Sequence, residues 1–371
     1  MNFSGFVVQL LNGLAGASSL FLVAAGLSLI FGVTRIVNFA HGSFYMVGVY
    51  IAYALVDRLE WLGFWFAVPI AALTVGVLGV IVEMTLLRRI YRAPELFQLL
   101  ATFALVLVIK DGVLWLFGPE ELLGPRAPGM TGSVEILGRQ FPAYDLFLIV
   151  VGPIVLGLLW ALLTRTRWGT LVRAATQDRE MVGALGVNQA WLFTAVFALG
   201  AMLAGLGGAL QLPREPANLE MDLHIIGSAF VVVVVGGMGS IPGAFVAALL
   251  ISEIKAICIW LGLVNVFGID ISFSKLTLVA EFVVMAVVLV VRPWGLMGKP
   301  QAASRAMGEA EMPIRPADKL FMTGVAVLAL ALLMLPPVTS ASPYVVVLVI
   351  DLLIAALFAA SLHFIMGPAG M

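Results

Sequence analysis

Charged residues and cysteines are scarce in this chain of 371 residues. Charged residues make up 11% of the sequence and hydrophobic residues 62%, and the mean hydropathy is +1.11. These values exclude an ordinary soluble globular domain and predict a polytopic membrane protein. A net charge of −1 gives no indication of nucleic acid binding. The single cysteine, Cys258, excludes an intrachain disulfide.

The sequence also lacks the patterns of metal, nucleotide and catalytic sites. Its three histidines, at positions 41, 224 and 363, and its one cysteine do not have the spacing of a metal site. It contains no glycine-rich loop of the G-x-x-x-x-G-K type, so we do not expect it to bind ATP in that way. No nucleophile with a matching base is evident. We therefore predict no metal, no cofactor and no enzymatic activity, and any energy from ATP has to come from partner proteins.

Ionisable residues are few within the apolar runs. Lys110 and Asp111 could pair locally, whereas Glu253 and Lys255, two residues apart, point to different faces of a helix. The set does not form the convergent acidic or histidine relay that an ion-coupled carrier uses. Its members are Glu83, Lys110, Asp111, Glu253, Lys255, Glu281, Asp351 and His363.

What the sequence does contain is a series of apolar runs, each long enough to cross a hydrocarbon core of about 30 Å as a helix of roughly 20 residues. They lack the alternation of an outer-membrane barrel, so the predicted fold is an all-α transmembrane bundle with discontinuous helices. The first run has no basic segment before it and no small-residue cleavage site, which predicts a first span and not a removable signal. The predicted spans lie near 6–32, 39–56, 62–87, 97–117, 144–163, 190–212, 223–235, 243–262, 277–291, 320–338 and 343–366.

The distribution of Lys and Arg predicts the orientation, because cytoplasmic loops carry the excess of basic residues. One set of loops collects 13 Lys and Arg residues and the opposite set collects 5. The richer set, predicted to be cytoplasmic, comprises 33–38, 88–96, 164–189, 236–242 and 292–319. The amino terminus is then outside, and 292–319 form a polar, Pro- and Gly-containing tether between two membrane units.

An internal repeat supports this division. The stretch "LVAAGLSLIFG" at 22–32 matches "LFAASLHFIMG" at 357–367 at six of eleven positions. In apolar sequence such matches are easy to find, but this one falls where a second unit should begin, directly after the linker.

A first polar interruption, "IVNFAHGS", places Asn38, His41, Gly42 and Ser43 between two apolar runs. A backbone group that has lost its helical partner costs several kcal/mol in lipid, so such a break is stable only in a protein interior or beside water. The stretch is therefore a candidate for a transport pathway. The alternative is a loop between spans, with His41 at the membrane surface and Asn38 capping the next helix.

A second interruption, "VVVVVGGMGSIPGA", contains Gly236, Gly237, Gly239 and Ser240 ahead of Pro242. Glycine allows close backbone approach and positive φ, and proline fits the first turn of a new helix. Two half-helices around exposed backbone would suit a binding position for small polar groups. A short cytoplasmic hairpin turn is the alternative.

The longest charged loop, 170–189, is predicted to hold a short amphipathic helix flanked by basic residues. Such a helix lies on anionic lipid or docks on another protein, and its physical properties alone favour lipid. Directly after it, Ala201, Gly205 and Ala209 recur every four residues, a stripe of small residues that predicts close helix packing.

Four segments together carry a resemblance to a known family. They are "GLSLIFGVTRIVNFAHGSFYMVGVYIA", "RAATQDREMVGALGVN", "VVVVVGGMGSIPGA" and "RPWGLMGK", and their order and spacing resemble those of the inner-membrane permease of bacterial branched-chain amino acid ABC importers. The resemblance covers about residues 5–298. The tail from about 316 resembles the opening of the companion permease, although Asp351 and His363 depart from that pattern.

The resemblance implies a domain organisation and a set of partners. Residues 1–298 would be a first permease unit of about nine crossing segments, 299–319 a cytoplasmic linker, and 320–371 the first two spans of a second, incomplete unit. The family works in the bacterial inner membrane with cytoplasmic ATP-binding subunits, a periplasmic substrate-binding protein and a companion permease. The implied function is import of branched-chain or similar small neutral amino acids; the alternatives are urea or short amides, or an ion-coupled secondary carrier.

The resemblance also assigns roles to residues. The two interruptions become parts of the substrate pathway, and their neutral polar groups suit a zwitterion with an aliphatic side chain, which needs no fixed counter-charge. The loop 170–189 becomes the helix that couples to an ATPase, although it matches the general coupling motif only loosely. Its candidate residues are Ala174, Ala175, Asp178, Ala184 and Gly186.

Overall fold

The computed structural model describes most of the chain. The described residues are 3–59, 63–91, 93–266, 269–298, 319–338 and 343–366. The chain divides into two compact units, Met1–Ala302 and Ala303–Met371. Residues 299–318 of the predicted linker and Gly367 of the predicted repeat lie outside the described residues.

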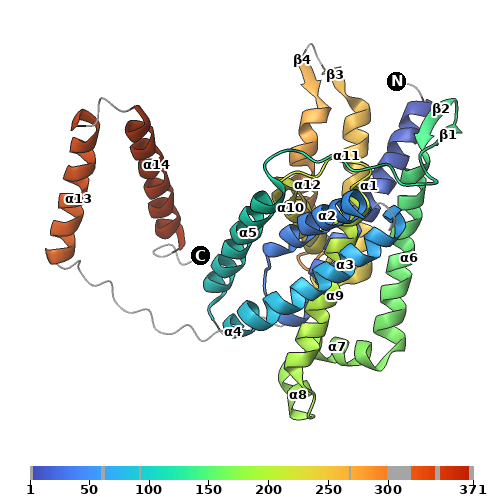
Figure 1. The fold of residues 1–371 in the computed structure, drawn as a ribbon, viewed down its shortest axis with the longest axis horizontal. Coiled ribbons are helices and arrows are strands. Elements are labelled where there is room, and N and C mark those ends of the chain that lie inside the picture. Colours follow the sequence, from blue (N-terminus) through green and yellow to red (C-terminus); the bar gives the residue numbers. More distant parts are fainter. Residues whose placement is uncertain are drawn as a thin grey trace. The chain divides into compact units, whose positions relative to one another are not determined.

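The first unit is a bundle of helices (Figure 1). Its long helices are α1 (Phe3–Thr34), α2 (Ala40–Arg58), α3 (Gly63–Val82), α5 (Glu95–Phe117), α6 (Ala143–Arg165), α9 (Gln189–Gln211), α10 (Met221–Gly236), α11 (Ile241–Leu261) and α12 (Phe273–Val291). Helix α3 continues through a π-helical turn, η2 (Glu83–Leu87), into α4 (Arg88–Ile90). The loop before α9 holds α7 (Arg167–Gln177) and α8 (Arg179–Ala184).

Within the described residues, the β-strands form two short antiparallel hairpins. The first pairs β1 (Ser133–Ile136) with β2 (Arg139–Pro142), and the second pairs β3 (Leu263–Val266) with β4 (Ile269–Ser272). The all-α prediction is confirmed. The second unit contributes α13 (Lys319–Val338) and α14 (Pro343–Met366).

Seven of these helices are long and apolar enough to cross a membrane. They are the helices that contain Phe3–Thr34, Gly63–Ile90, Leu96–Phe117, Ala143–Arg165, Gln189–Gln211, Ile241–Leu261 and Tyr344–Ser361. The other four predicted spans correspond to α2, α10, α12 and α13. The helix boundaries follow the apolar runs because each run ends at charge, glycine or proline.

Small residues allow the central helices to approach closely. Ala201 and Ala209 of the predicted stripe are fully buried on α9, and a Cβ at Gly205 would lie 2.7 Å from Val75 of α3. On the α1 side, a Cβ at Gly200 would lie 2.6 Å from Ile30. The stripe prediction is confirmed, and α1, whose middle and lower parts are almost wholly buried, lies at the centre of the unit.

The connecting segments of this unit gather at two ends. One end, which we call the hairpin end, holds β1, β2, β3, β4 and the start of α1, and lies at the top in Figure 1. The other, the α8 end, holds α7, α8 and the α10–α11 turn. All five loops predicted to be cytoplasmic lie toward the α8 end where the structure describes them. For example, Gly32 contacts Gly239, Arg88 contacts Thr194, and Gly237 contacts Gly298.

Candidate functional site

The first interruption forms an extended connection between α1 and α2 that is deeply buried. Asn38 Oδ1 accepts a hydrogen bond from the Ala40 N–H at 3.1 Å and closes a short turn in front of α2. The N-cap residue of α2 is Phe39, and the helix begins without a side-chain cap. The His41 ring Nε2 lies 2.9 Å from the Val23 carbonyl oxygen, and Ser43 Oγ donates to Asp222 Oδ2 at 3.4 Å. The three side chains are at most 1% exposed, so His41 is inside the bundle and not at the membrane surface.

Several polar atoms near this interruption lack a hydrogen-bond partner within the described part of the chain. They are Ser28 Oγ, Asn38 Nδ2 and His41 Nδ1. Buried polar groups are normally satisfied, so these atoms are suited to a water or a polar solute that passes nearby. Gly42 brings α2 close to α10, where a Cβ would lie 2.9 Å from Ile226.

The second interruption is a tight turn between α10 and α11. Gly237 and Gly239 adopt φ of +100° and +83°, and Ser240 Oγ accepts from the Gly243 N–H at 3.2 Å as the cap of α11. The last carbonyls of α10 accept from the segment after α12: Leu296 N–H donates to Val235 and Met297 N–H to Gly236, at 2.8 and 3.0 Å. This geometry is the hairpin alternative, and it explains why "RPWGLMGK" accompanies the glycines.

A cavity of about 650 Å³ opens at the α8 end. Its wall combines the second interruption, at Gly239 and Ser240, with α7, at Arg173 and Thr176, and with Arg35 after α1. The predicted pathway residues therefore divide: Gly239 and Ser240 line this cavity, whereas Asn38, His41, Gly42, Ser43, Gly236 and Gly237 line neither cavity described here. The pathway role of all eight stays a prediction.

A second cavity, of about 540 Å³, opens toward the hairpin end between α1, α2, α9, α10 and α11. On α1 it reaches Leu20, and the α8-end cavity begins at Phe31. The contact between His41 and Val23 lies between these two levels of α1. The first interruption thus occupies the height that separates the two cavities.

The charged loop before α9 contains two short helices where one was predicted. Thr166 caps α7, Asp178 caps α8 through a 2.9 Å bond from the Met181 N–H, and Asn188 caps α9. Asp178 splits the helix because its side chain satisfies a backbone donor that a continuous helix would use.

The predicted coupling residues also divide between two environments. Ala175 is buried against the core and Ala174 packs beside it. Asp178, Ala184 and Gly186 are exposed. Asp178 caps α8 and Ala184 ends it, and α8 is the helix at the bottom of Figure 1. Gly186 has φ of +82° with open space around it. The coupling role itself stays a prediction.

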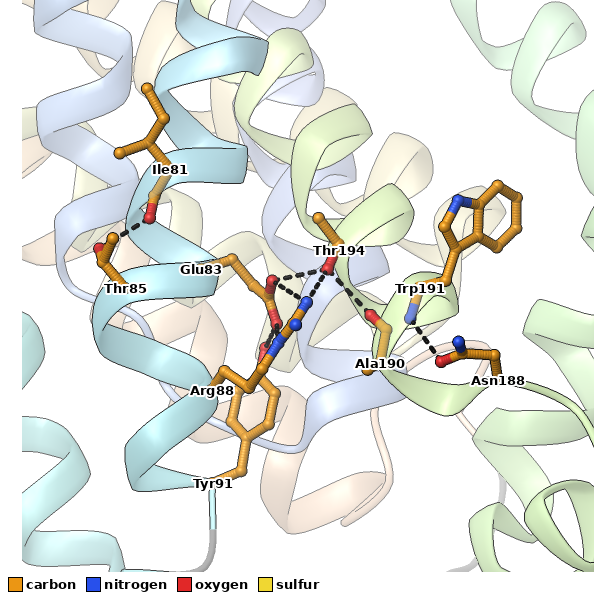
Figure 2. Close-up of polar contacts among 9 residues, drawn as sticks. All are labelled: Ile81, Glu83, Thr85, Arg88, Tyr91, Asn188, Ala190, Trp191 and Thr194. Carbon is orange, nitrogen blue, oxygen red and sulfur yellow. Dashed lines mark hydrogen bonds and ion pairs between the residues drawn. The ribbon is translucent and has the colours of Figure 1, made fainter.

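A buried ion-pair cluster ties the start of α9 to the end of α3 (Figure 2). Glu83 is fully buried, and its carboxylate accepts from Arg88 Nη2 at 3.1 Å, from the Tyr91 hydroxyl at 3.0 Å and from Thr194 Oγ at 2.6 Å. Arg88 Nη2 also donates to Thr194 Oγ at 2.6 Å. The sequence shows Glu83 only as one of a few ionisable residues in apolar runs. Its partners follow a π-helical turn or lie 111 positions away, and neither arrangement has a sequence pattern.

Two further ion pairs join different segments of the chain, and the first of them replaces the local pairing considered for Lys110 and Asp111. Lys110 Nζ lies 3.4 Å from Glu220 Oε1, on the segment before α10, and does not pair with Asp111. Adjacent helical residues point about 100° apart, which carries the two side chains away from each other. Lys255 Nζ lies 2.5 Å from Glu281 Oε2 on α12, and Ser228 bonds to both.

Comparison with known proteins identifies the family. The model of the family described as branched-chain amino acid transport system / permease component matches residues 9–292. BraD of Pseudomonas aeruginosa, named a high-affinity branched-chain amino acid transport system permease protein, is 28% identical over 309 residues, which cover 80% of this chain and 97% of BraD.

Two proteins of Escherichia coli (strain K12) named as permease proteins of the high-affinity branched-chain amino acid transport system are also similar. LivH is 24% identical over 80% of this chain and 96% of LivH. LivM is 26% identical over 62% of this chain and 59% of LivM. No solved structure matches the chain. Since the family model covers more than half of the sequence, this chain belongs to the permease component family of branched-chain amino acid transport systems.

Proposed function

We propose that this chain is the permease subunit of an ABC importer that moves branched-chain or similar small neutral amino acids across the bacterial inner membrane. One observation carries the proposal beyond family membership. The α8-end cavity is walled by both the glycine-rich turn at Gly239 and Ser240 and the coupling loop at Arg173 and Thr176. Movement of the loop by a docked protein would therefore change the shape of the cavity directly.

The proposed path runs from the hairpin-end cavity, past the first interruption, to the α8-end cavity. The buried polar atoms Asn38 Nδ2 and His41 Nδ1 lie at the level that closes the path in this structure. We place the α8 end in the cytoplasm and the amino terminus in the periplasm, because the basic loops belong to the α8 end. The family is one of transport components, and the chain carries no enzymatic role in the proposal.

The proposed partners are two cytoplasmic ATP-binding subunits, a periplasmic substrate-binding protein and a companion permease. Support for the companion comes from LivH and LivM, two permease proteins named for one transport system in one organism, both similar to this chain. We propose further that α13 and α14 correspond to the first two spans of a second permease unit. Support for this is their location in a separate compact unit after the linker.

The experiment is reconstitution of the chain in vesicles together with ATPase subunits, a binding protein and a companion permease from the same organism. We expect leucine uptake that requires ATP, the binding protein and the complete companion. Uptake by the chain alone, driven by an ion gradient, would establish a secondary carrier. ATP-dependent uptake of urea or acetamide, with no uptake of leucine, would show that the chain belongs to an ABC importer with a different substrate.

A further inference from the structure

The hairpin-end cavity has a polar lining that the family assignment does not explain. It contains two cations, Arg214 after α9 and Lys255 on α11, and one exposed carboxylate, Glu215. It also contains Gln211, at the last position of α9, which is 6% exposed and has no hydrogen-bond partner for Oε1 in the described part of the chain.

Both cations are held from behind by buried carboxylates that do not line the cavity. Arg214 Nε lies 2.9 Å from Asp145 Oδ1 of α6, and Lys255 Nζ lies 2.5 Å from Glu281 Oε2. Each carboxylate is 8% exposed. A guanidinium has five N–H donors and an ammonium three, so these contacts leave donors on both side chains for a group in the cavity. The carboxylates fix the direction of the cations and offset their charge.

Acceptors lie on the same turn as Arg214. The main chain carbonyl of Gln211 accepts from the N–H groups of Arg214 and Glu215 at 2.8 and 3.1 Å, which keeps the three residues in one compact turn. Gln211 and Glu215 both lie on this turn and line the cavity, with the Gln211 amide oxygen buried behind the wall. Donors and acceptors of opposite charge therefore line one small volume.

The lining also has further polar side chains, among them Asn12, Asn218 and His224, and an aliphatic part. Leu20 of α1, Ile225 of α10 and Ile259 of α11 contribute to the wall, so the cavity has an apolar part beside its charged part. A neutral solute with an ammonium, a carboxylate and a short aliphatic chain matches both parts. Urea and short amides lack the charges that Arg214 and Glu215 are placed to meet.

From this arrangement we infer that the hairpin-end cavity is a binding site for a zwitterionic aliphatic amino acid within the permease itself. Arg214 and Lys255 bind the α-carboxylate, and Gln211 Oε1 with Glu215 binds the α-ammonium. The inference rests on the function proposed above and deepens it, because it gives the permease a part in recognising the substrate. The inference departs from the expectation that such a substrate needs no fixed counter-charge.

The test is protection of a cysteine in the cavity wall, which requires neither ATP nor binding protein. Ile225→Cys is made in a Cys258→Ala background, in membranes that contain the chain with its companion permease. Modification by a small water-soluble thiol reagent is timed with and without millimolar leucine. We expect leucine to slow modification, and expect neither leucinamide, which lacks the carboxylate, nor 4-methyl-2-oxopentanoate, which lacks the ammonium, to do so.

Gln211→Met separates binding from folding. Because Gln211 Oε1 has no partner in the described structure, the substitution should leave the midpoint of thermal unfolding unchanged or raise it, while the leucine concentration for half protection rises about tenfold. The matched control is Gln98→Met, which removes a buried amide that does donate, to the Ala93 carbonyl at 2.7 Å. That variant should unfold at lower temperature with protection unchanged.

Lys255→Met with Glu281→Gln, which avoids an unpaired buried carboxylate, should also weaken protection, whereas Lys110→Met with Glu220→Gln should not. Equal protection by all three solutes, or unchanged protection in Gln211→Met and in the Lys255 double variant, overturns the inference. Leucine protection without ATP-dependent uptake would contradict the importer function and leave this site intact. ATP-dependent leucine uptake without leucine protection of the cysteine would support the importer function and contradict this binding site.

Discussion

The two ends of the first unit differ in whether the cations of their cavity walls are paired with carboxylates. At the hairpin end each cation that lines the cavity has a carboxylate behind it, Asp145 for Arg214 and Glu281 for Lys255. At the α8 end the described cavity wall contains Arg35 and Arg173, and no acidic side chain. The first arrangement suits a small neutral solute with internal charges. The second suits the release of an anionic group or contact with an acidic partner.

The ends also differ in their apolar surface. Beyond the α8-end cavity, α8 and the turn after it expose Met181 and Leu185 at 59% and 76%. A projecting helix with exposed apolar residues and basic neighbours fits either a protein groove or a lipid surface. The buried Glu83 cluster bonds to α9, the helix that follows α8, and holds its start in place. Under the proposed function, the hairpin end would bind the substrate and the α8 end would contact the ATPase.

The largest expected effect is at the Glu83 cluster. Glu83→Ala removes the acceptor of three donors and leaves Arg88 without its carboxylate, which should cost about 3 kcal/mol of unfolding free energy, the lower part of the range because Arg88 is partly exposed. Asp145→Ala at the other end should cost less, since Arg214 then faces an open cavity with Glu215. Thermal unfolding of the purified chain in detergent measures both. Equal losses of unfolding free energy in the two variants would show that the ion pairs at the α8 end and at the hairpin end stabilise the fold equally.

A second test concerns what α8 contacts. Ala184→Trp adds exposed bulk to α8, which a protein groove would reject, so ATPase stimulation by loaded binding protein should fall to near the basal rate with assembly unchanged. Ala190→Trp, exposed at the start of α9, is the control and should retain stimulation. A helix that lies on lipid would accept the tryptophan. ATPase stimulation at the wild-type level in the Ala184 variant would favour a loop that lies on the membrane surface over one that docks on an ATPase.

Cysteine accessibility distinguishes the two interruptions. In a Cys258→Ala background, Ser240→Cys at the α8-end cavity should react with small water-soluble reagents roughly 100-fold faster than Asn38→Cys or Ser43→Cys, which are closed in by the bundle. Substrate turnover should raise the rate at positions 38 and 43 if the path opens there. Rates at these two positions that stay slow during active uptake would leave the first interruption as a structural turn.

The smallest expected effect compares glycines at the two ends. Gly186 and Gly138, in the turn between β1 and β2, have φ of +82° and +77°, and neither has an atom within 4 Å of a built Cβ. Alanine at either site should cost about 1 kcal/mol, since the cost is local to the backbone. Only Gly186→Ala should also reduce ATPase stimulation. Parallel losses of stimulation in both variants would mean that general destabilisation, and not the position of α8, controls coupling.

The helices could be predicted because apolar runs, glycine and proline are local signals. The predicted turn at Ser240 and Pro242 and the turn closed by Asn38 follow from side chains a few residues from their partners. Sequence reasoning also predicted the stripe on α9, because small residues four apart have few other uses in a membrane helix.

The sites themselves depend on pairs that are distant in sequence. Glu83 meets Thr194, Lys255 meets Glu281, and Arg214 meets Asp145, and no local pattern indicates these partners. Gln211 was not singled out because a glutamine at a helix end is common and usually solvated. Its signal, a buried amide oxygen without a partner, exists only in three dimensions. The cavity it lines could therefore not be predicted from the sequence.

The π-helical turn at Glu83–Leu87 changes which residues after it share a face with the residues before it. In an uninterrupted α-helix, residues five apart lie on different faces, so Arg88 would point well away from Glu83. The wider turn absorbs one residue and returns Arg88 and Tyr91 to the face of Glu83. A helical wheel for 63–91 must therefore shift by one position at Glu83. A relative that lacks one residue in this turn would keep the cluster if its arginine lay four residues after the glutamate. A one-residue deletion at this point would therefore be compatible with the same fold.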